Sequence, residues 1–339
     1  MTITSENTSV ETSGRLNFTE APATISVIGV GGGGCNAVMR MIKDRTIPGV
    51  RYICVNTDVK SLGKAPDGVQ LVYIGERLTH GLGAGGNPEV GAQAADTGKE
   101  AIEKAIAGSD LVFLTVGMGG GTGTGAAPVV AEMVRRTGAL TVAIATTPFS
   151  WEGARRMETA MSGLSHLREK VDNLVVVHND RLLKIRKKDV SILEALKIAD
   201  QVVMQGVHSV AEVVNMPGEI NVDMADVKSI MKLPGTALMA VGEAEGPGAA
   251  LQAAQIAVNN PLVNLSIDGA KGILFNVKGG SNLMLGEVNA VGEFIAHKVA
   301  PDAIIFFGMV NQTNTQQQDH VGITVIATGI PENAAQQKK

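Results

Sequence analysis

The segment Gly117-Met118-Gly119-Gly120-Gly121-Thr122-Gly123-Thr124-Gly125 decides how this sequence is interpreted. It holds six glycines and two threonines in nine positions, between an apolar run at 111–116 and a helical pattern at 126–136. Glycines cost conformational entropy on folding and bring no side chains to pack, and a structural turn needs only one or two of them. Successive backbone N–H groups together with two hydroxyls form a nest for an anion. We therefore expect a phosphate-binding loop here.

Two other glycine runs occupy comparable positions. The first, 29–34, satisfies the pattern GxGxxG between a predicted strand at 24–30 and a helical pattern at 35–42. In that context backbone N–H groups and the positive end of the helix face a phosphate. The third run, 81–88, follows a predicted strand at 69–75, so three loops could converge on one polyphosphate. The motif GxxxxGK[ST] is absent from the sequence, which excludes a P-loop protein.

Alternating strands and helices predict a parallel, doubly wound α/β domain. Apart from those already given, the predicted strands are 51–58, 140–148 and 174–179, with a further helix at 96–106. A helical pattern at 191–215 follows, longer than an average helix, and predicts a central helix.

The pattern changes beyond residue 216 and predicts a smaller α/β domain with a mixed four-stranded sheet. Its strands are expected at 236–242, 272–277, 303–310 and 322–328, with helices at about 248–259 and 286–299. The expected organisation is a disordered tail (1–21), a first domain (22–190), the central helix (191–215), a second domain (216–330) and a polar tail (331–339).

Composition limits the classes of function. The chain has 339 residues, 45 % of them hydrophobic, and a net charge of −4. The length favours two domains, and the absence of a basic excess argues against nucleic acid as the main ligand. Cys35 and Cys54 lie in apolar or glycine-rich stretches and are expected to be buried free thiols. No apolar run reaches the roughly 18 residues that span a bilayer, and the N-terminus does not resemble a signal peptide, so we expect a cytoplasmic protein without direct membrane insertion.

The glycine-rich nonapeptide resembles the signature loop of the tubulin/FtsZ family, and its Thr-Gly-Thr-Gly end is more similar to FtsZ proteins than to eukaryotic tubulins. Residues 31–38 resemble the first phosphate loop of that family, and 56–58 and 83–89 resemble its second and third. The similarity runs in order from about residue 24 to about residue 330 and covers both domains. It implies the tubulin/FtsZ fold, GTP or GDP as ligand and Mg²⁺ as cofactor; whether a monovalent cation assists stays open.

The resemblance also implies the residues that hold the nucleotide phosphates. They are Gly31, Gly32, Gly33, Cys35, Asn36, Asn56, Asp58, Gly85, Gly86, Asn87, Gly117, Gly119, Gly120, Gly121, Thr122, Gly123 and Thr124. It places the ribose near 147–149 and 152–156, with Pro148, Glu152 and Arg156 as contacts.

For the base, the resemblance points to Asn179 and Asp200. The Asn179 amide both donates and accepts, which suits a purine edge, and the Asp200 carboxylate can accept two N–H groups of guanine, a pattern that adenine lacks. FtsZ proteins usually carry an aromatic residue four positions before this acid, stacked on guanine. This chain has Leu196 at that position, so a stacking contribution to guanine binding stays open. Recognition of guanine by hydrogen bonds to Asn179 and Asp200 is still expected.

Asp223 and Asp226 open a predicted helix at 221–231, where capping and the helix dipole explain both acids. The segment is also similar to the FtsZ loop Asn-x-Asp-x-x-Asp, matched by Asn221, Asp223 and Asp226. The resemblance implies that the two carboxylates reach the nucleotide of a neighbouring subunit and polarise the water that attacks the γ-phosphate. An active site completed at such a heterologous contact generates a head-to-tail filament of the chain with itself.

Two other functions compete with this GTPase. An NAD-dependent Rossmann enzyme is suggested by 29–34 and Asp58, but a dinucleotide needs only one glycine loop. A non-hydrolysing GTP-binding structural polymer is opposed by Asp223 and Asp226. The resemblance further implies a location at the division site, with membrane-tethering and ring-associated division proteins as partners. Whether the source is bacterial or archaeal stays open.

Overall fold

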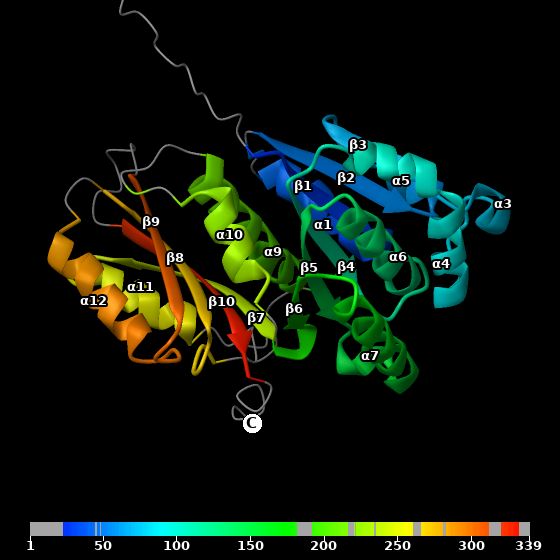
Figure 1. The fold of residues 1–339 in the computed structure, drawn as a ribbon. Coiled ribbons are helices and arrows are strands. Elements are labelled where there is room, and N and C mark those ends of the chain that lie inside the picture. Colours follow the sequence, from blue (N-terminus) through cyan, green and yellow to red (C-terminus); the bar gives the residue numbers. More distant parts are fainter. Residues whose placement is uncertain are drawn as a thin grey trace, which may run out of the picture.

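The computed structural model describes residues 23–44, 46–47, 49–181, 192–215, 220, 222–233, 235–259, 266–280, 283–311 and 320–331. Two α/β units lie side by side, with the long helix α9 (Ile192–Asn215) between them (Figure 1). The predicted tail 1–21, and all but Pro331 of the predicted tail 331–339, lie outside the described residues.

The first unit is built on a parallel six-stranded sheet, as predicted. Its strand order is β3-β2-β1-β4-β5-β6. The strands are β1 (Ile25–Val30), β2 (Val50–Asn56), β3 (Val69–Tyr73), β4 (Leu111–Gly117), β5 (Leu140–Thr147) and β6 (Asn173–His178). The chain order reverses between β1 and β4, and ligands of open α/β sheets bind outside the carboxyl ends of the strands at such a switch point. The first two glycine runs follow these two strands, so sequence and topology place both at the same crevice.

Helices cover both faces of this sheet because its strands are apolar on both sides. β1 shows the division: Val27 belongs to one buried cluster and Ile28 to the other. The first face is covered by α1 (Gly31–Asp44) and α9. The second face is covered by α4 (Pro88–Thr97), α5 (Lys99–Ile106), α6 (Thr122–Arg136) and α7 (Ala154–Arg168); the short helices are α2 (Val59–Leu62), α3 (Glu76–Thr79) and η1 (Ser150–Glu152).

The helix predicted at 96–106 is in fact two helices. α4 ends at Thr97 and α5 begins at Lys99, with Gly98 between them. α4 begins with an N-cap and a proline: the Asn87 side chain accepts the Glu89 N–H at 2.9 Å, and Pro88 follows at the first helical position. The pair Asn87-Pro88 is a signal for a helix start that is visible in the sequence.

The second unit has a mixed sheet of four strands, again as predicted. The order is β7-β10-β8-β9, with β10 antiparallel to β7 and β8, and β8 parallel to β9. The strands are β7 (Thr236–Glu245), β8 (Gly272–Gly279), β9 (Ile304–Asn311) and β10 (His320–Ile330); the helices are α10 (Met224–Met231), α11 (Ala249–Val258) and α12 (Leu285–Ala296).

The two units share one apolar core. The cluster that contains Val27 of β1 continues through Val207 of α9 to Ile323 of β10. The Asn173 amide of the first unit also donates to the Met231 carbonyl of the second. Among the described residues, no helix is both long and apolar enough to cross a membrane. The domain boundaries given above stay predictions.

Candidate functional site

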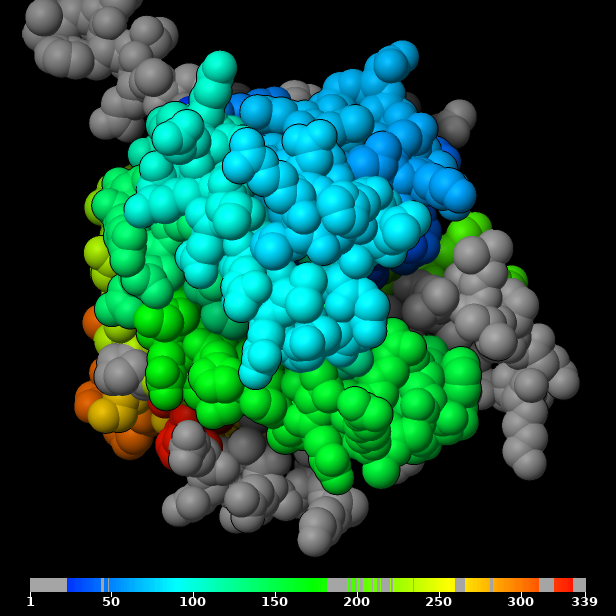
Figure 2. All heavy atoms as spheres, turned by 90° about the vertical axis from the view of Figure 1, so that its right-hand side faces the viewer, coloured from blue at the N-terminus to red at the C-terminus, as the bar shows by residue number. Residues whose placement is uncertain are grey.

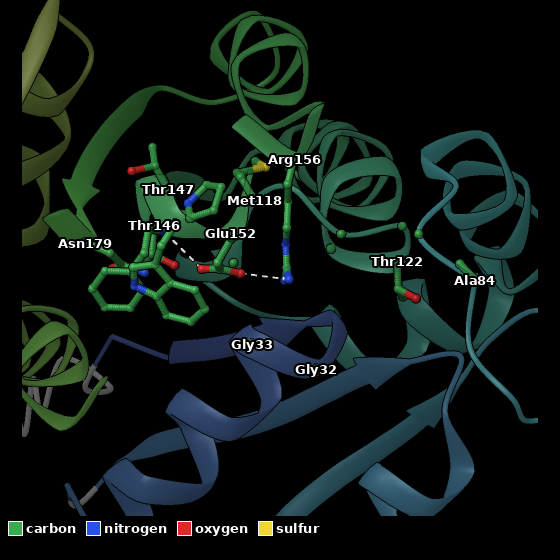
Figure 3. A pocket seen from close by; sticks show the side chains of 18 residues that line it. Gly32, Gly33, Ala84, Met118, Thr122, Thr146, Thr147, Glu152, Arg156 and Asn179 are labelled. Atoms are coloured by element: carbon green, nitrogen blue, oxygen red, sulfur yellow. Dashed lines mark hydrogen bonds and ion pairs between the residues drawn. The ribbon is translucent and has the colours of Figure 1, made fainter. Parts of the chain in front are cut away.

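A cavity of about 460 Å³ lies at the switch point (Figure 3). It is lined by Gly32, Gly33, Ala84, Gly86, Gly117, Met118, Gly120, Gly121, Thr122, Gly123, Thr146, Thr147, Pro148, Phe149, Trp151, Glu152, Arg156 and Asn179. The segments that flank it, α3–α4 in cyan and η1–α7 in green, meet on one face of the molecule (Figure 2). All three glycine runs therefore contribute to one pocket, as the sequence led us to expect.

The glycine runs are held together by direct contact of their backbones. A Cβ atom at Gly31 would lie 2.6 Å from the Gly123 nitrogen, and one at Gly121 would lie 2.8 Å from the Asn87 nitrogen. A Cβ at Gly125 would lie only 1.8 Å from the Pro88 carbonyl oxygen. No side chain fits at these positions, so part of the glycine content serves the packing of one loop on another.

Other glycines leave space for a ligand. Gly32 and Gly120 both line the cavity, and a Cβ atom at either would have no neighbour within 4 Å. Gly120 directly precedes the start of α6 at Gly121–Thr122, where the first N–H groups of the helix have no intrahelical partner. This helix end is electropositive and suits a phosphate.

The two threonines of the second run have different positions. The Thr124 hydroxyl accepts the Gly119 N–H at 2.9 Å and so closes the loop on itself. The Thr122 side chain lines the cavity, and its hydroxyl lies 2.6 Å from that of Thr57. Thr122 thus offers an oxygen to the pocket, whereas Thr124 shapes the loop.

The opposite end of the cavity is formed by the segment after β5. Glu152 accepts the Phe149 N–H at 2.9 Å and pairs with Arg156 at 2.7 Å, as the dashed line in Figure 3 shows. The next strand contributes too, because Asp180 accepts the Ser150 N–H at 2.9 Å. These contacts hold a polar pair, Glu152 and Arg156, at the pocket wall.

Asn179 stands out as a binding group. It follows β6, is only 7 % exposed, and its side-chain oxygen finds no hydrogen-bond partner among the described residues. A buried acceptor without a donor costs about 1–3 kcal/mol. Because Asn179 lines the cavity, a ligand N–H would satisfy this oxygen.

Asp200 is not among the lining residues. Its carboxylate pairs with Arg40 of α1, and its side chain is 14 % exposed. Burial raises the pKa of Asp200, and the Arg40 guanidinium acts in the opposite direction. In this structure the Asp200 carboxylate, which the sequence analysis assigns to guanine, is therefore paired with Arg40.

Further predicted residues also lie outside the lining. They are Gly31, Cys35, Asn36, Asn56, Asp58, Gly85, Asn87, Gly119 and Thr124. Asp58 caps α2 by accepting the Ser61 N–H at 3.2 Å. Cys35 is a buried free thiol, as is Cys54; its hydrogen bond with Cys54, and then burial, raise the pKa of Cys35 well above its usual value. Their roles toward a ligand stay predictions.

The acidic residues of α10 are not part of the cavity lining either. The exposed Asp223 caps the helix by accepting the Asp226 N–H at 2.7 Å. In Figure 1, α10 lies beside α9 on the side of the second unit, whereas α3 and α4 lie at the far right. Asn221 lies outside the described residues.

The sequence did not single out four residues that line the cavity: Ala84, Met118, Thr146 and Trp151. Thr146 could have been found, since β5 is the neighbour of β4 and its carboxyl end must lie at the same sheet edge. Trp151 is the only tryptophan of the chain and lies between Pro148 and Glu152, which were both predicted.

Comparisons with known proteins agree with this geometry. Residues 24–187 match the model of the tubulin/FtsZ family GTPase domain, and residues 235–331 match that of the FtsZ family C-terminal domain. An empty FtsZ dimer from M. jannaschii is similar at 40 % identity and a TM-score of 0.84, over 93 % of this chain and 90 % of that one.

More distant structures share the fold. CetZ2 from Haloferax volcanii, a GTPγS-bound protofilament, has 21 % identity and a TM-score of 0.78, over 93 % of this chain and 97 % of that one. The two matched domains and the similarity across nearly the whole chain lead to one conclusion: this chain belongs to the tubulin/FtsZ family, with its GTPase domain in the first unit.

Proposed function

We propose that the chain binds GTP in the 460 Å³ cavity, hydrolyses it to GDP and phosphate, and polymerises head-to-tail into the filaments of a cell-division ring. The observation that carries the proposal is that the two ends of this one cavity differ in chemistry. One end offers bare backbone and a helix N-terminus, and the other offers the unpartnered Asn179 oxygen. A nucleotide needs both, a donor-rich cradle for its phosphates and an acceptor for its base.

Each end of the cavity then has a defined task. Gly120, Gly121 and Thr122 hold the phosphates through backbone N–H groups and the positive end of α6. Glu152 and Arg156 face the ribose, and Asn179 accepts an N–H of the base. Asp200 reads guanine only if its carboxylate leaves Arg40 or is shared with it.

Mg²⁺ would neutralise phosphate charge during hydrolysis. Among the described residues there is no cluster of three or more His, Cys, Asp or Glu side chains that could hold a metal. The ion would be held by phosphate oxygens and by an oxygen such as the Thr122 hydroxyl, a set that suits Mg²⁺.

Hydrolysis would need a second copy of the chain. The carboxylates of Asp223 and Asp226 do not line the chain's own cavity, so we assign them to the cavity of the next subunit, where they polarise the attacking water. The relatives support such self-association: the M. jannaschii FtsZ structure is a dimer, and the CetZ2 structure is a protofilament. From membership of the family we also propose a cytoplasmic location at the division site, with membrane-tethering and ring-associated proteins as further partners.

A mixing experiment tests the proposal. Asp226→Asn removes a catalytic carboxylate and leaves the pocket intact, whereas Gly120→Asp puts a negative charge into the phosphate end, at a position where a Cβ atom meets nothing within 4 Å. Each variant alone should release phosphate slowly. An equimolar mixture should recover at most about a quarter of the activity of the unchanged chain, because only a contact between the pocket of an Asp226→Asn subunit and the acidic helix of a Gly120→Asp subunit is complete.

A protein concentration series is the second part of the test. Phosphate release per subunit of the unchanged chain should rise steeply above a threshold protein concentration. A flat concentration series together with an inactive mixture would place all catalytic groups on one subunit and contradict the proposal. Titration with fluorescent GTP and with NADH separates the proposal from a dinucleotide-binding enzyme.

A further inference from the structure

Trp151 is an exposed aromatic side chain held in a fixed position. It lies in η1, lines the cavity and is 65 % exposed. Its indole stacks on the ring of Phe149, with the ring centroids 5.5 Å apart and the planes at 16°. Phe149 is only 5 % exposed, so it supports the indole from the protein side.

The backbone around Trp151 is fastened as well. Glu152 accepts the Phe149 N–H at 2.9 Å, and Asp180 accepts both the backbone N–H and the hydroxyl of Ser150, at 2.9 and 3.2 Å. The turn therefore holds the indole without help from a ligand. A rigid aromatic group loses little entropy when it binds, which is the property of a preformed contact.

The surroundings of Trp151 identify the end of the cavity to which it belongs. Ser150 precedes Trp151 and is bonded to Asp180, which directly follows Asn179. Trp151 and Asn179 therefore lie at the same end, away from the glycine loops that would hold the phosphates. The Asn179 oxygen, buried and without a partner, is an independent indication that a ligand with an N–H group fills this end.

On the basis of the proposed nucleotide site, we propose that Trp151 packs the free face of its indole against the nucleoside of the bound nucleotide. Phe149 stacks on one face of the indole. Because Trp151 lines the cavity and is 65 % exposed, its other face is open to a flat group bound there. Aromatic side chains stack on nucleobases of any identity because every base has a π face.

The chain allows a direct optical test, because Trp151 is its single tryptophan. Intrinsic fluorescence would be recorded at a protein concentration below the assembly threshold while GDP is added, with calorimetry in parallel. We expect a saturable fluorescence change with the midpoint of the calorimetric curve. Inorganic tripolyphosphate, which has no nucleoside, should bind with little change in fluorescence.

Variants give the second readout. Trp151→Ala should weaken GDP binding about five- to ten-fold, in the range of base–aromatic stacking, whereas Trp151→Phe should stay within about two-fold. Neither should alter tripolyphosphate binding. Met161→Ala, which removes another exposed apolar side chain outside the cavity, serves as the control and should leave GDP binding unchanged.

The outcomes separate this inference from the proposed function. Calorimetric binding of GDP without a fluorescence change, and unaltered in Trp151→Ala, would overturn the stacking role and leave the nucleotide site standing. Absence of GTP and GDP binding to the unchanged chain would overturn both. A fluorescence change that appears only above the assembly threshold would assign Trp151 to a contact between copies and likewise overturn the stacking role.

Discussion

Arg40 of α1 and Asp200 of α9 form an ion pair across the contact of these two helices. α1 begins in the first glycine run, and α9 lies between the two units. The pair therefore links the helix that begins in the first glycine run to the helix between the two units. Burial favours the neutral form of Asp200, and the nearby guanidinium favours the charged form.

Arg40→Met should destabilise the fold in a pH-dependent manner. The pKa of Asp200 is raised by burial, so this group favours folding at low pH and loses that contribution as the pH rises through its folded-state value. Without Arg40 the charged carboxylate would be buried without a partner, which costs about 3–5 kcal/mol near pH 7. The cost should shrink as Asp200 becomes protonated. Urea unfolding at pH 5, 6 and 7 measures it.

Lys43→Met is the matched control for that series, since Lys43 is an exposed cation on the same helix. It should change the free energy of unfolding little at any of the three pH values. A penalty for Arg40→Met that does not vary with pH would mean that lost packing of the arginine stem, rather than the ion pair, causes it.

Gly125→Ala and Gly120→Ala should have opposite phenotypes although they lie in one loop. A Cβ at Gly125 would lie 1.8 Å from the Pro88 carbonyl, so the substitution should prevent the loops from packing and strongly lower the melting temperature. A Cβ at Gly120 meets nothing within 4 Å and would enter the cavity. Gly120→Ala should keep its stability and bind GTP about ten-fold more weakly, the equivalent of one charge-assisted hydrogen bond of about 1.4 kcal/mol.

Gly292→Ala on α12 controls for the general effect of replacing a glycine, because a Cβ there also has open space but lies outside the cavity. Differential scanning calorimetry and GTP titration distinguish the three variants. If Gly120→Ala and Gly125→Ala lost stability to the same extent, the division of the loop into packing and ligand-facing glycines would be wrong.

The parallel sheet and the three converging loops were predictable because their determinants are local. Short apolar runs such as 111–116, followed by glycines, are typical of buried parallel strands, and glycine runs after such strands meet at the carboxyl edge of the sheet. The reason for the glycines was only partly predictable. The sequence suggested that most of them, Gly121 included, serve the ligand, but Gly121 and Gly125 are required because other backbones approach them, and such long-range approaches leave no local pattern.

The fine structure of the site depended on tertiary contacts that the sequence does not reveal. Nothing in the sequence pairs Arg40 with Asp200, which lie 160 positions apart. The support of Trp151 by Phe149 likewise depends on the conformation of a short turn. By contrast, the capping role of Asp223 was readable, because an acid immediately before a helical pattern is a common N-cap.

His178 should make the stability of the first unit fall at mildly acidic pH. Burial lowers the pKa of His178, the positive charge of Arg181 adds to this effect, and Asp180 opposes it. A histidine with a lowered pKa contributes stability that is present above its unfolded value of about 6.5 and is lost as the pH falls through the folded value. His178→Gln should therefore lose less stability than the unchanged chain between pH 7 and pH 5.

The exposed His166 on α7 provides the comparison for His178. His166→Gln should follow the pH profile of the unchanged chain in the same unfolding series. The other titrating groups are common to all three proteins, so their contributions cancel in the differences. Parallel profiles for all three would show that the protonation of His178 is not linked to folding.

Asp223→Asn and Asp226→Asn should separate charge from helix capping in α10. The Asp223 side chain accepts the Asp226 N–H at 2.7 Å, and asparagine caps helices about as well as aspartate. Both asparagine variants should therefore unfold like the unchanged chain, whereas Asp223→Ala should lose about 1 kcal/mol with the cap. If the carboxylates polarise the attacking water, both asparagine variants should lower GTP turnover about a hundred-fold or more.

GTP binding and filament assembly of the two asparagine variants are the further readouts. GTP affinity should be unchanged in both asparagine variants, because neither residue lines its own cavity, and GTP filaments should persist because the γ-phosphate is retained. Asp302→Asn, which neutralises an exposed acid elsewhere in the second unit, should turn over GTP normally. Sedimentation and phosphate release are measured on the same samples. If Asp226→Asn failed to bind GTP, α10 would lie at the nucleotide of its own subunit, and catalysis between neighbouring copies would be refuted.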